Sequence, residues 1–125
     1  MAEIKRIKPT GAYVAKDVVV NEVMNMIRGT TPTHTFKLPF DVDIIKSVMI
    51  VYAQRNKEIL RKETADCTME GEDITTTLTQ EETFKFNHVD HVHIQLRVLT
   101  KDGTAMVSEP KVVNVKDCLN YEVLT

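Results

Sequence analysis

Hydrophobic and polar residues alternate along much of the chain after Thr33, which is the pattern of β-strands that bury one face. The clearest predicted strand spans residues 92–98, with an inward face formed by Val92, Ile94, Leu96 and Val98. Residues 35–40 repeat the pattern, with an apolar face formed by Phe36, Leu38 and Phe40. Because Pro39 donates no backbone hydrogen bond, this second strand is predicted to lie at a sheet edge or to end there.

A different pattern appears at residues 47–54, where both faces of the predicted strand are apolar. Such a strand is either central in a sheet or has an outer face that meets another chain. Met49 and Val51 lie two residues apart and therefore share one face. We select them as candidate contacts to a partner.

Turn signals separate the predicted strands. Asn56 and the segment 69–73 each predict a turn, and Ile74, Thr76 and Leu78 alternate after the second one. The pair Asp102–Gly103 predicts a tight hairpin whose two central residues both have positive φ. Pro110 predicts that the return strand, residues 105–115, is broken in two or lies at an edge. Six or seven short strands at this spacing predict an antiparallel β-sandwich, with a small barrel as the alternative.

The N-terminal part differs from the rest of the chain in charge. Residues 1–17 carry four basic and two acidic side chains, a local charge of +2, so the remainder carries −4 to give the net −2. We predict an extended arm over residues 1–23 and a sandwich domain over residues 24–125. The segment 17–29 fits either a capped helix or two short strands, and composition favours the strands. The basic arm residues that we select as candidate partner contacts are Lys5, Arg6 and Lys8.

Composition supports a single β-rich domain. Of 125 residues, 16 are Val, 9 Ile and 15 Thr, so about a third are β-branched and favour strands. A net charge of −2 lacks the basic footprint of a nucleic-acid-binding domain, so no specific nucleic acid is expected. No stretch has the length and apolar character of a membrane span or a signal peptide, so we expect synthesis in the cytoplasm and no membrane partner.

Histidine and cysteine residues offer the main candidates for metal or redox chemistry. Three of the four histidines lie in the segment Asn87–His93. His91 and His93 would share a strand face about 7 Å apart, close enough for two ligands of zinc or nickel, but a third ligand would have to come from another strand or chain. Strand geometry favours the alternative, solvent-facing polar residues. Cys67 and Cys118 are expected to be free buried thiols, with a disulfide as the alternative.

The sequence offers no constellation for catalysis. The acidic residues are too scattered to nominate a general acid and base: Glu70, Glu72, Asp73, Glu81 and Glu82. Only Ser47 and Ser108 are available as serine nucleophiles, and no phosphate-binding loop, nucleophile elbow or metalloprotease motif occurs. We therefore expect a protein that is not an enzyme and carries no cofactor.

Three stretches of the chain together resemble a known family: Arg28–Phe40, Leu78–Phe86 and Gln95–Ser108. They are similar to small virion structural proteins of tailed phages and prophages of Firmicutes. They also resemble, more distantly, the immunoglobulin-like N-terminal domain of phage upper-baseplate proteins. The resemblance covers residues 24–124 and implies an all-β, immunoglobulin-like antiparallel sandwich that follows the arm. It concerns strand and turn patterns and includes no catalytic signature.

The resemblance implies a noncatalytic virion protein that acts through contacts with other virion proteins and with copies of itself. Capsid decoration or a head accessory role is the first expectation, because a small sandwich with a reaching arm suits a subunit attached to a lattice. A tail or baseplate subunit is the alternative. A carbohydrate-binding sandwich is a further alternative, but the chain has no Trp and only three Tyr beside four Phe. In the virion setting, the arm would lie extended along a neighbouring subunit or the capsid surface, either adding a strand to an exposed sheet edge or laying Val18, Val19 and Val20 into a groove.

Overall fold

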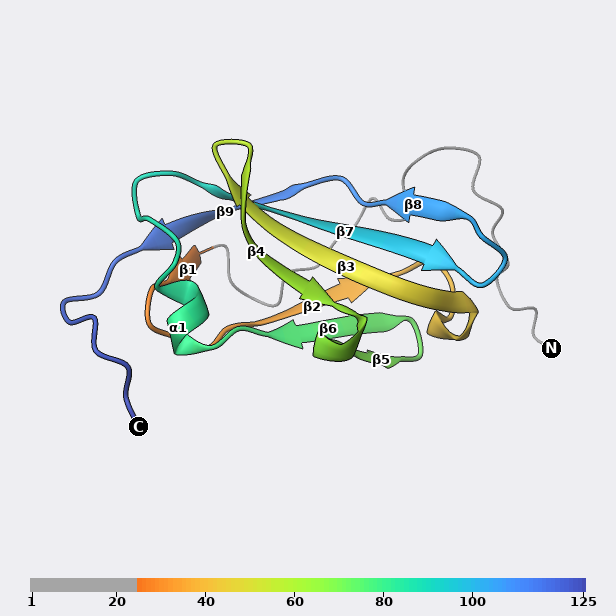
Figure 1. The fold of residues 1–125 in the computed structure, drawn as a ribbon, viewed down its shortest axis with the longest axis horizontal. Helices are drawn as coiled ribbons and strands as arrows, with labels where there is room; N and C mark the ends of the chain where they lie inside the picture. The colour runs from red at the N-terminus through yellow and green to blue at the C-terminus, as the bar shows by residue number, and fades with distance from the viewer. Residues whose placement is uncertain (1–24) are drawn as a thin grey trace.

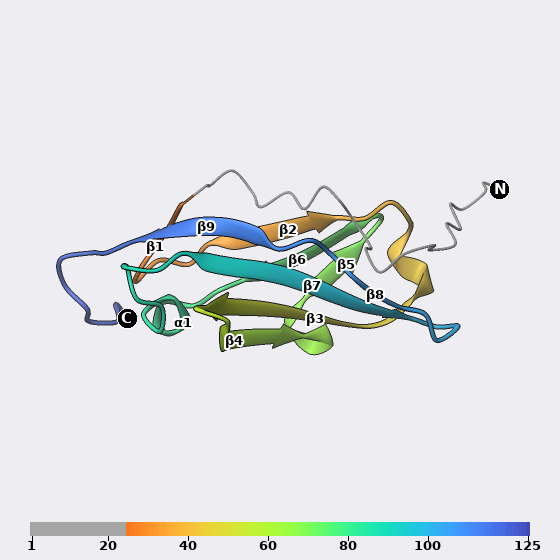
Figure 2. The same cartoon turned by 90° about the horizontal axis from the view of Figure 1, so that it is seen from above.

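A computed structural model describes residues 25–125, which form a sandwich of two β-sheets with very little helix (Figure 1). Most of the larger sheet lies above the smaller one in Figure 1, and the two sheets overlap when the molecule is seen from above (Figure 2). The larger sheet contains β1 (Asn25–Ile27), β3 (Ile45–Gln54), β4 (Lys57–Glu63), β7 (Val92–Thr100), β8 (Ala105–Val107) and β9 (Lys111–Lys116). The smaller sheet contains β2 (Thr33–Lys37), β5 (Thr68–Glu70) and β6 (Asp73–Thr77).

The strand order identifies the type of sandwich. The larger sheet has the order β1-β9-β7-β3-β4 with β8 beside β7, and the smaller has the order β2-β6-β5. These orders correspond to strands G-F-C-C′ against B-E-D of the immunoglobulin-like sandwich. The predicted all-β, immunoglobulin-like fold is confirmed, and the barrel alternative is wrong because the strands form two open sheets. One pair departs from the expected antiparallel arrangement, since β1 runs parallel to β9.

The core lies between the sheets and consists largely of the predicted inward faces. All four predicted inward residues of β7 are at most 3% exposed, and Phe36, Leu38 and Phe40 are at most 4% exposed. As predicted, β2 lies at a sheet edge and ends before Pro39. The strand β3 is central, between β4 and β7, and its inner face is fully buried at Ile50 and Tyr52.

The predicted turns are present, and one of them differs in type. Arg55 and Asn56 both have positive φ and join β3 to β4, and Pro110 separates β8 from β9. In the hairpin after β7 only Gly103 has positive φ, whereas Asp102 does not. The Gly103 N–H donates to the Thr100 carbonyl, which closes a type I turn followed by a left-handed residue. The predicted two-residue turn is therefore wrong, because the loop uses three residues.

Three short helical turns connect the strands, and composition did not predict them. They are η1 (Val42–Ile44), η2 (Thr64–Asp66) and α1 (Gln80–Thr83). Thr79 and Glu82 cap α1 reciprocally, each side chain accepting a hydrogen bond from the other residue's backbone N–H. No helix in the described part of the chain is both long and apolar enough to cross a membrane.

Of the segment 17–29, the strand alternative is confirmed for residues 25–27, which form β1. The rest of that segment up to residue 24, and the whole predicted arm, lie outside the described residues.

Candidate protein-contact face

The outer face of the larger sheet, which we call the contact face, is a row of half-buried apolar side chains bordered by charges. Met49 on β3 pairs with Glu63 on β4 and with Arg97 on β7, and Arg97 in turn pairs with Val107 on β8. The next outward position on β3, Val51, lies between Arg61 and Gln95. These side chains point outward because their strand neighbours fill the core.

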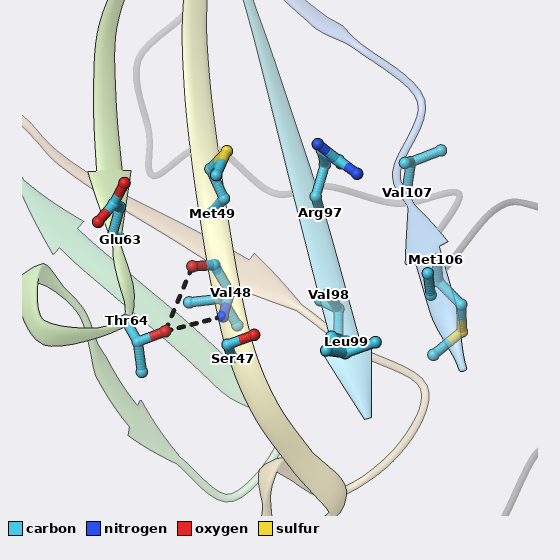
Figure 3. A pocket seen from close by; sticks show the side chains of 11 residues that line it. Ser47, Val48, Met49, Glu63, Thr64, Arg97, Val98, Leu99, Met106 and Val107 are labelled. Atoms are coloured by element: carbon cyan, nitrogen blue, oxygen red, sulfur yellow. Dashed lines mark hydrogen bonds between the residues drawn. The ribbon is translucent and has the colours of Figure 1, made fainter. Parts of the chain in front are cut away.

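An open hollow of about 510 Å³ lies on this face (Figure 3). Four of its side chains project side by side from neighbouring strands: Glu63, Met49, Arg97 and Val107. Ser47 and Leu99 lie further along the sheet. The hollow is open to solvent and bordered by apolar side chains, so it suits contact with a protein surface better than enclosure of a small molecule.

Thr64 shapes the rim of the hollow where β4 ends. The Val48 N–H donates to Thr64 Oγ1 at 3.0 Å, and the hydroxyl donates to the Val48 carbonyl at 3.4 Å (Figure 3). A side chain thus replaces the backbone partner that β3 loses beyond Glu63, and the chain turns away into η2. The backbone groups of Val48 therefore keep hydrogen-bond partners at the point where β4 ends and the chain leaves the sheet.

The charges on the contact face are only partly neutralised within it. Arg61 makes a two-pronged ion pair with Glu58 at 3.0 and 3.1 Å, and a longer one with Glu63 at 3.5 Å. Arg97 is exposed and has no ion pair with any residue between 25 and 125. An exposed guanidinium beside Met49 and Val107 leaves planar, multidentate donors available to an acidic group on a partner.

The structure brings together some of the predicted contact residues. Met49 and Val51 both lie on the contact face, although sequence reasoning missed Arg97, Leu99 and Val107. The alternating pattern of β7 marks Arg97 as outward-facing, but only the register places it beside Met49. The remaining predicted contacts lie outside the described residues: Lys5, Arg6, Lys8, Val18, Val19 and Val20.

The predicted metal candidates do not form a cluster in the described part of the chain. His91 and His93 are both exposed, and His88 lies 3.5 Å from Asp117. Among residues 25–125, no three His, Cys, Asp or Glu side chains are grouped so that they could hold a metal ion. His91 and His93 are therefore solvent-facing polar residues, as the alternative prediction stated.

Both cysteines are free and half-buried, so the disulfide alternative is wrong. Burial raises the pKa of Cys67, which keeps its thiol protonated at neutral pH. Antibody-type domains join their two sheets by a disulfide, and this domain has none among its described residues.

A polar pair links the two sheets through the core instead. His34 on β2 is 4% exposed, and its Nδ1 shares a hydrogen bond of 2.6 Å with the hydroxyl of Tyr52 on β3. Burial lowers the pKa of His34 to about 4 and raises that of Tyr52, so both side chains are neutral at pH 7. His34 lies two residues before Phe36 on the same strand face, so the alternating pattern indicates that His34 is buried as well.

Gln54, at the end of β3, fixes the loop before β7. Its Nε2 donates to the carbonyls of Asn87 and Asp90, both at 2.9 Å, and its Oε1 accepts from the Asn87 N–H at 3.1 Å. The side chain is 3% exposed and satisfies three backbone groups at once. The Gln54 amide therefore holds the loop that carries His88 and Val89 to the sheet, together with the Arg55–Asp90 ion pair at 3.0 Å.

Replacing this amide should loosen the loop. We expect Gln54→Leu to lower the free energy of unfolding by about 2 kcal/mol, because three backbone groups lose their partner. Urea unfolding would measure the loss. Gln95→Leu is the matched control, because Gln95 is only half-buried and donates a single hydrogen bond, to the Ser108 carbonyl. Equal losses in the two variants would contradict this role of Gln54.

Arg28 fastens the C-terminal segment to the sandwich. Its guanidinium donates to Asp117 at 2.8 Å and to the Phe84 carbonyl at 3.0 Å, and lies 4.7 Å from the ring centre of Tyr121. The hydrogen bonds from Tyr121 and Arg28 lower the pKa of Asp117 to about 2. These contacts explain the position of residues 117–121, although the Arg28 Nε is buried without a hydrogen-bond partner among the described residues.

Comparison with known proteins yields fold likeness alone. No protein-family model matches the chain, and no curated protein is similar to it in sequence. Among solved structures, it is similar to the immunoglobulin-like domain of mouse leukocyte-associated immunoglobulin-like receptor 1, solved as a strand-swapped dimer. The match has 12% identity and a TM-score of 0.44, and covers 84% of this chain and 99% of that one. The extracellular domain of the same receptor matches at 12% identity and a TM-score of 0.39, over 89% and 96% of the two chains. Neither likeness bears on function.

Proposed function

We propose that the protein is a noncatalytic virion structural subunit, with capsid decoration ahead of a tail or baseplate role. The phage assignment rests on the sequence resemblance. The contact mode is supported by one observation, the half-buried apolar row of the contact face with Arg97 beside it. An apolar row bordered by exposed charges has the anatomy of a protein interface. The partners would be other virion proteins and further copies of this chain.

The described residues offer little to a carbohydrate-binding function. Such sites present exposed aromatic platforms, whereas Tyr52, Phe36, Phe40 and Phe86 are at most 1% exposed. Tyr121 is 55% exposed, but its ring is engaged by Arg28 and its hydroxyl donates to Asp117. Contact with protein therefore remains the proposal.

A charge placed on the contact face should prevent incorporation into particles without unfolding the domain. We expect Met49→Glu to change the melting temperature little, because the attraction of the new carboxylate to Arg97 on one side offsets its repulsion from Glu63 on the other. The variant should reduce the copies per purified particle at least tenfold. Quantitative mass spectrometry of particles would measure this. Thr68→Glu, at an exposed position of the opposite sheet, is the matched control.

A second variant tests the arm. Deleting residues 1–22 should leave a folded domain that no longer joins particles. Full incorporation of both the truncated chain and Met49→Glu would contradict the proposal, as would absence of the unaltered protein from the particles. Its position in an electron-microscopy map, on the head or on the tail, would decide between the two roles.

A further inference from the structure

The outer side of β2 is an open sheet edge. In the part of the chain described, β2 pairs only with β6 (Figure 1). At the two ends of this ladder, the Leu38 N–H donates to the Glu72 carbonyl and the Leu78 N–H to the Pro32 carbonyl. Because bonded and non-bonded pairs alternate in an antiparallel ladder, the even-numbered residues of β2 bond to β6. The backbone groups of Thr33, Thr35 and Lys37 therefore point away from β6, toward the open edge.

Of the edge strands in the described chain, β2 is the least protected against pairing with a further strand. The edge of β4 is rich in charged side chains and its register is interrupted by a bulge, and β1, β5 and β8 have three residues each. By contrast, β2 has five residues in unbroken register and no proline. Its single charged side chain, Lys37, is paired with Asp73 at 2.9 Å. Edges of this kind attract an added strand.

The sequence outside the described residues holds one strong candidate for that strand. Residues 16–20 end in the run Val18-Val19-Val20 and equal β2 in length. Three consecutive β-branched residues favour extended backbone, and an added strand gains main-chain hydrogen bonds whatever its side chains are.

The position of β1 favours donation to a second copy over pairing within one chain. The start of β1, Asn25, is in register with Asn114 of β9, in the sheet opposite β2. A straight continuation of β1 toward lower residue numbers would follow β9. Pairing with its own β2 would require the chain to change sheets within residues 21–24, which contain neither glycine nor proline. Donation to a second copy would not require this change of sheet within one chain.

We propose that residues 16–20 of one copy add a strand to the open edge of β2 in a second copy. Reaching a neighbouring subunit is the role that the proposed function gives to this arm, and the present proposal rests on it. Each chain then has one donor segment and one acceptor edge. Exchange therefore gives a two-fold dimer, a closed ring or an open chain of subunits, according to the rotation that relates neighbouring copies.

Proline substitutions at the edge and in the donor test the exchange. Thr35→Pro removes a backbone N–H that points toward the open edge and leaves the β2–β6 hydrogen bonds in place. Thr35→Ala is its matched control, because it loses the same side-chain contact with Thr75 but keeps the N–H. Val19→Pro disrupts the donor, and Val19→Thr keeps its N–H and β-branching. Because Val19 lies outside the described sandwich, its variants keep the test usable if Thr35→Pro fails to fold.

The measurement is the mass of the full-length chain by size-exclusion chromatography with light scattering. We expect the unaltered chain, Thr35→Ala and Val19→Thr to have at least twice the 14.2 kDa chain mass. Val19→Pro and Thr35→Pro should associate at least tenfold more weakly. A mixture of these two variants should form a heterodimer, because one chain retains the acceptor edge and the other retains the donor.

Three results would overturn the exchange: a monomeric unaltered chain, association that survives Val19→Pro, or a mixture without heterodimer. A monomer whose melting temperature falls in Val19→Pro would show that the segment pairs with its own β2, which also overturns donation to a second copy. The particle assay separates this proposal from the function. A monomer in solution that still enters particles refutes the exchange alone, whereas an oligomer that is absent from particles refutes the virion role.

Discussion

Lowering the pH from 7 to 4 is expected to reduce the free energy of unfolding by about 3 kcal/mol through His34 alone. Burial lowers the pKa of this imidazole from 6.5 to about 4. Above pH 6.5 the side chain is neutral in both folded and unfolded chains and contributes no pH dependence. Between pH 6.5 and 4 the unfolded chain binds a proton that the folded chain excludes, so stability falls through this window and levels off below it.

Urea unfolding at half-unit pH steps would measure the effect. Carboxylates also gain protons near pH 4, so the informative comparison is with His34→Gln. Its amide can still form a hydrogen bond with the Tyr52 hydroxyl but does not titrate. The variant should lose the part of the slope that falls between pH 6.5 and 4. Parallel stability curves for the two proteins would show that His34 is not buried as described.

The contribution of His34 shows which parts of the core the sequence could reveal. Alternation places His34 on the same strand face as Phe36 and Leu38, so its burial follows from the pattern. Its hydrogen bond to Tyr52 does not, because the two residues belong to different sheets and meet only when those sheets pack. Strand patterns specify which face turns inward, but not which strand lies opposite.

The same limit applies to the contact face. The apolar outer face of β3 was evident in the sequence, and with it Met49 and Val51. The register between β3, β7 and β8 places Arg97 and Val107 on the same face. They lie 48 and 58 residues after Met49 in the sequence. Such long-range pairing depends on the packing of the whole sandwich, so no local pattern contains it.

A further element was missed although its signal is local. The sequence Thr79-Gln-Glu-Glu82 has a capping-box spacing, and the structure forms both reciprocal hydrogen bonds there. The β-rich composition favours strands and so argues against the helix that this spacing indicates. A helix of only four residues is marginal alone, and α1 depends on what Glu82 contacts in the sandwich.

That contact predicts the second large effect. The Lys62 ammonium on β4 donates to both carboxylate oxygens of Glu82, at 2.8 and 2.9 Å, and the side chains are only 9% and 22% exposed. Burial alone would raise the pKa of Glu82, but hydrogen bonds from Lys62 and the Thr79 backbone outweigh it and lower the pKa. Lys62→Met should reduce the free energy of unfolding by about 3 kcal/mol, because it leaves a largely buried carboxylate without its cation.

The double variant separates the ion pair from the helix cap. Glu82→Gln keeps an acceptor for the Thr79 N–H, so it removes the charge and retains the capping box. In Lys62→Met with Glu82→Gln no buried charge remains, and the methionine fills the space of the lysine stem. We therefore expect the double variant to regain about 2 kcal/mol relative to Lys62→Met, as measured by urea unfolding. If the free-energy losses of Lys62→Met and Glu82→Gln simply add in the double variant, the two charges do not interact. In that case α1 would be held by its cap and by the buried Thr83, whose hydroxyl donates to the Thr30 carbonyl and accepts from the Gly29 N–H.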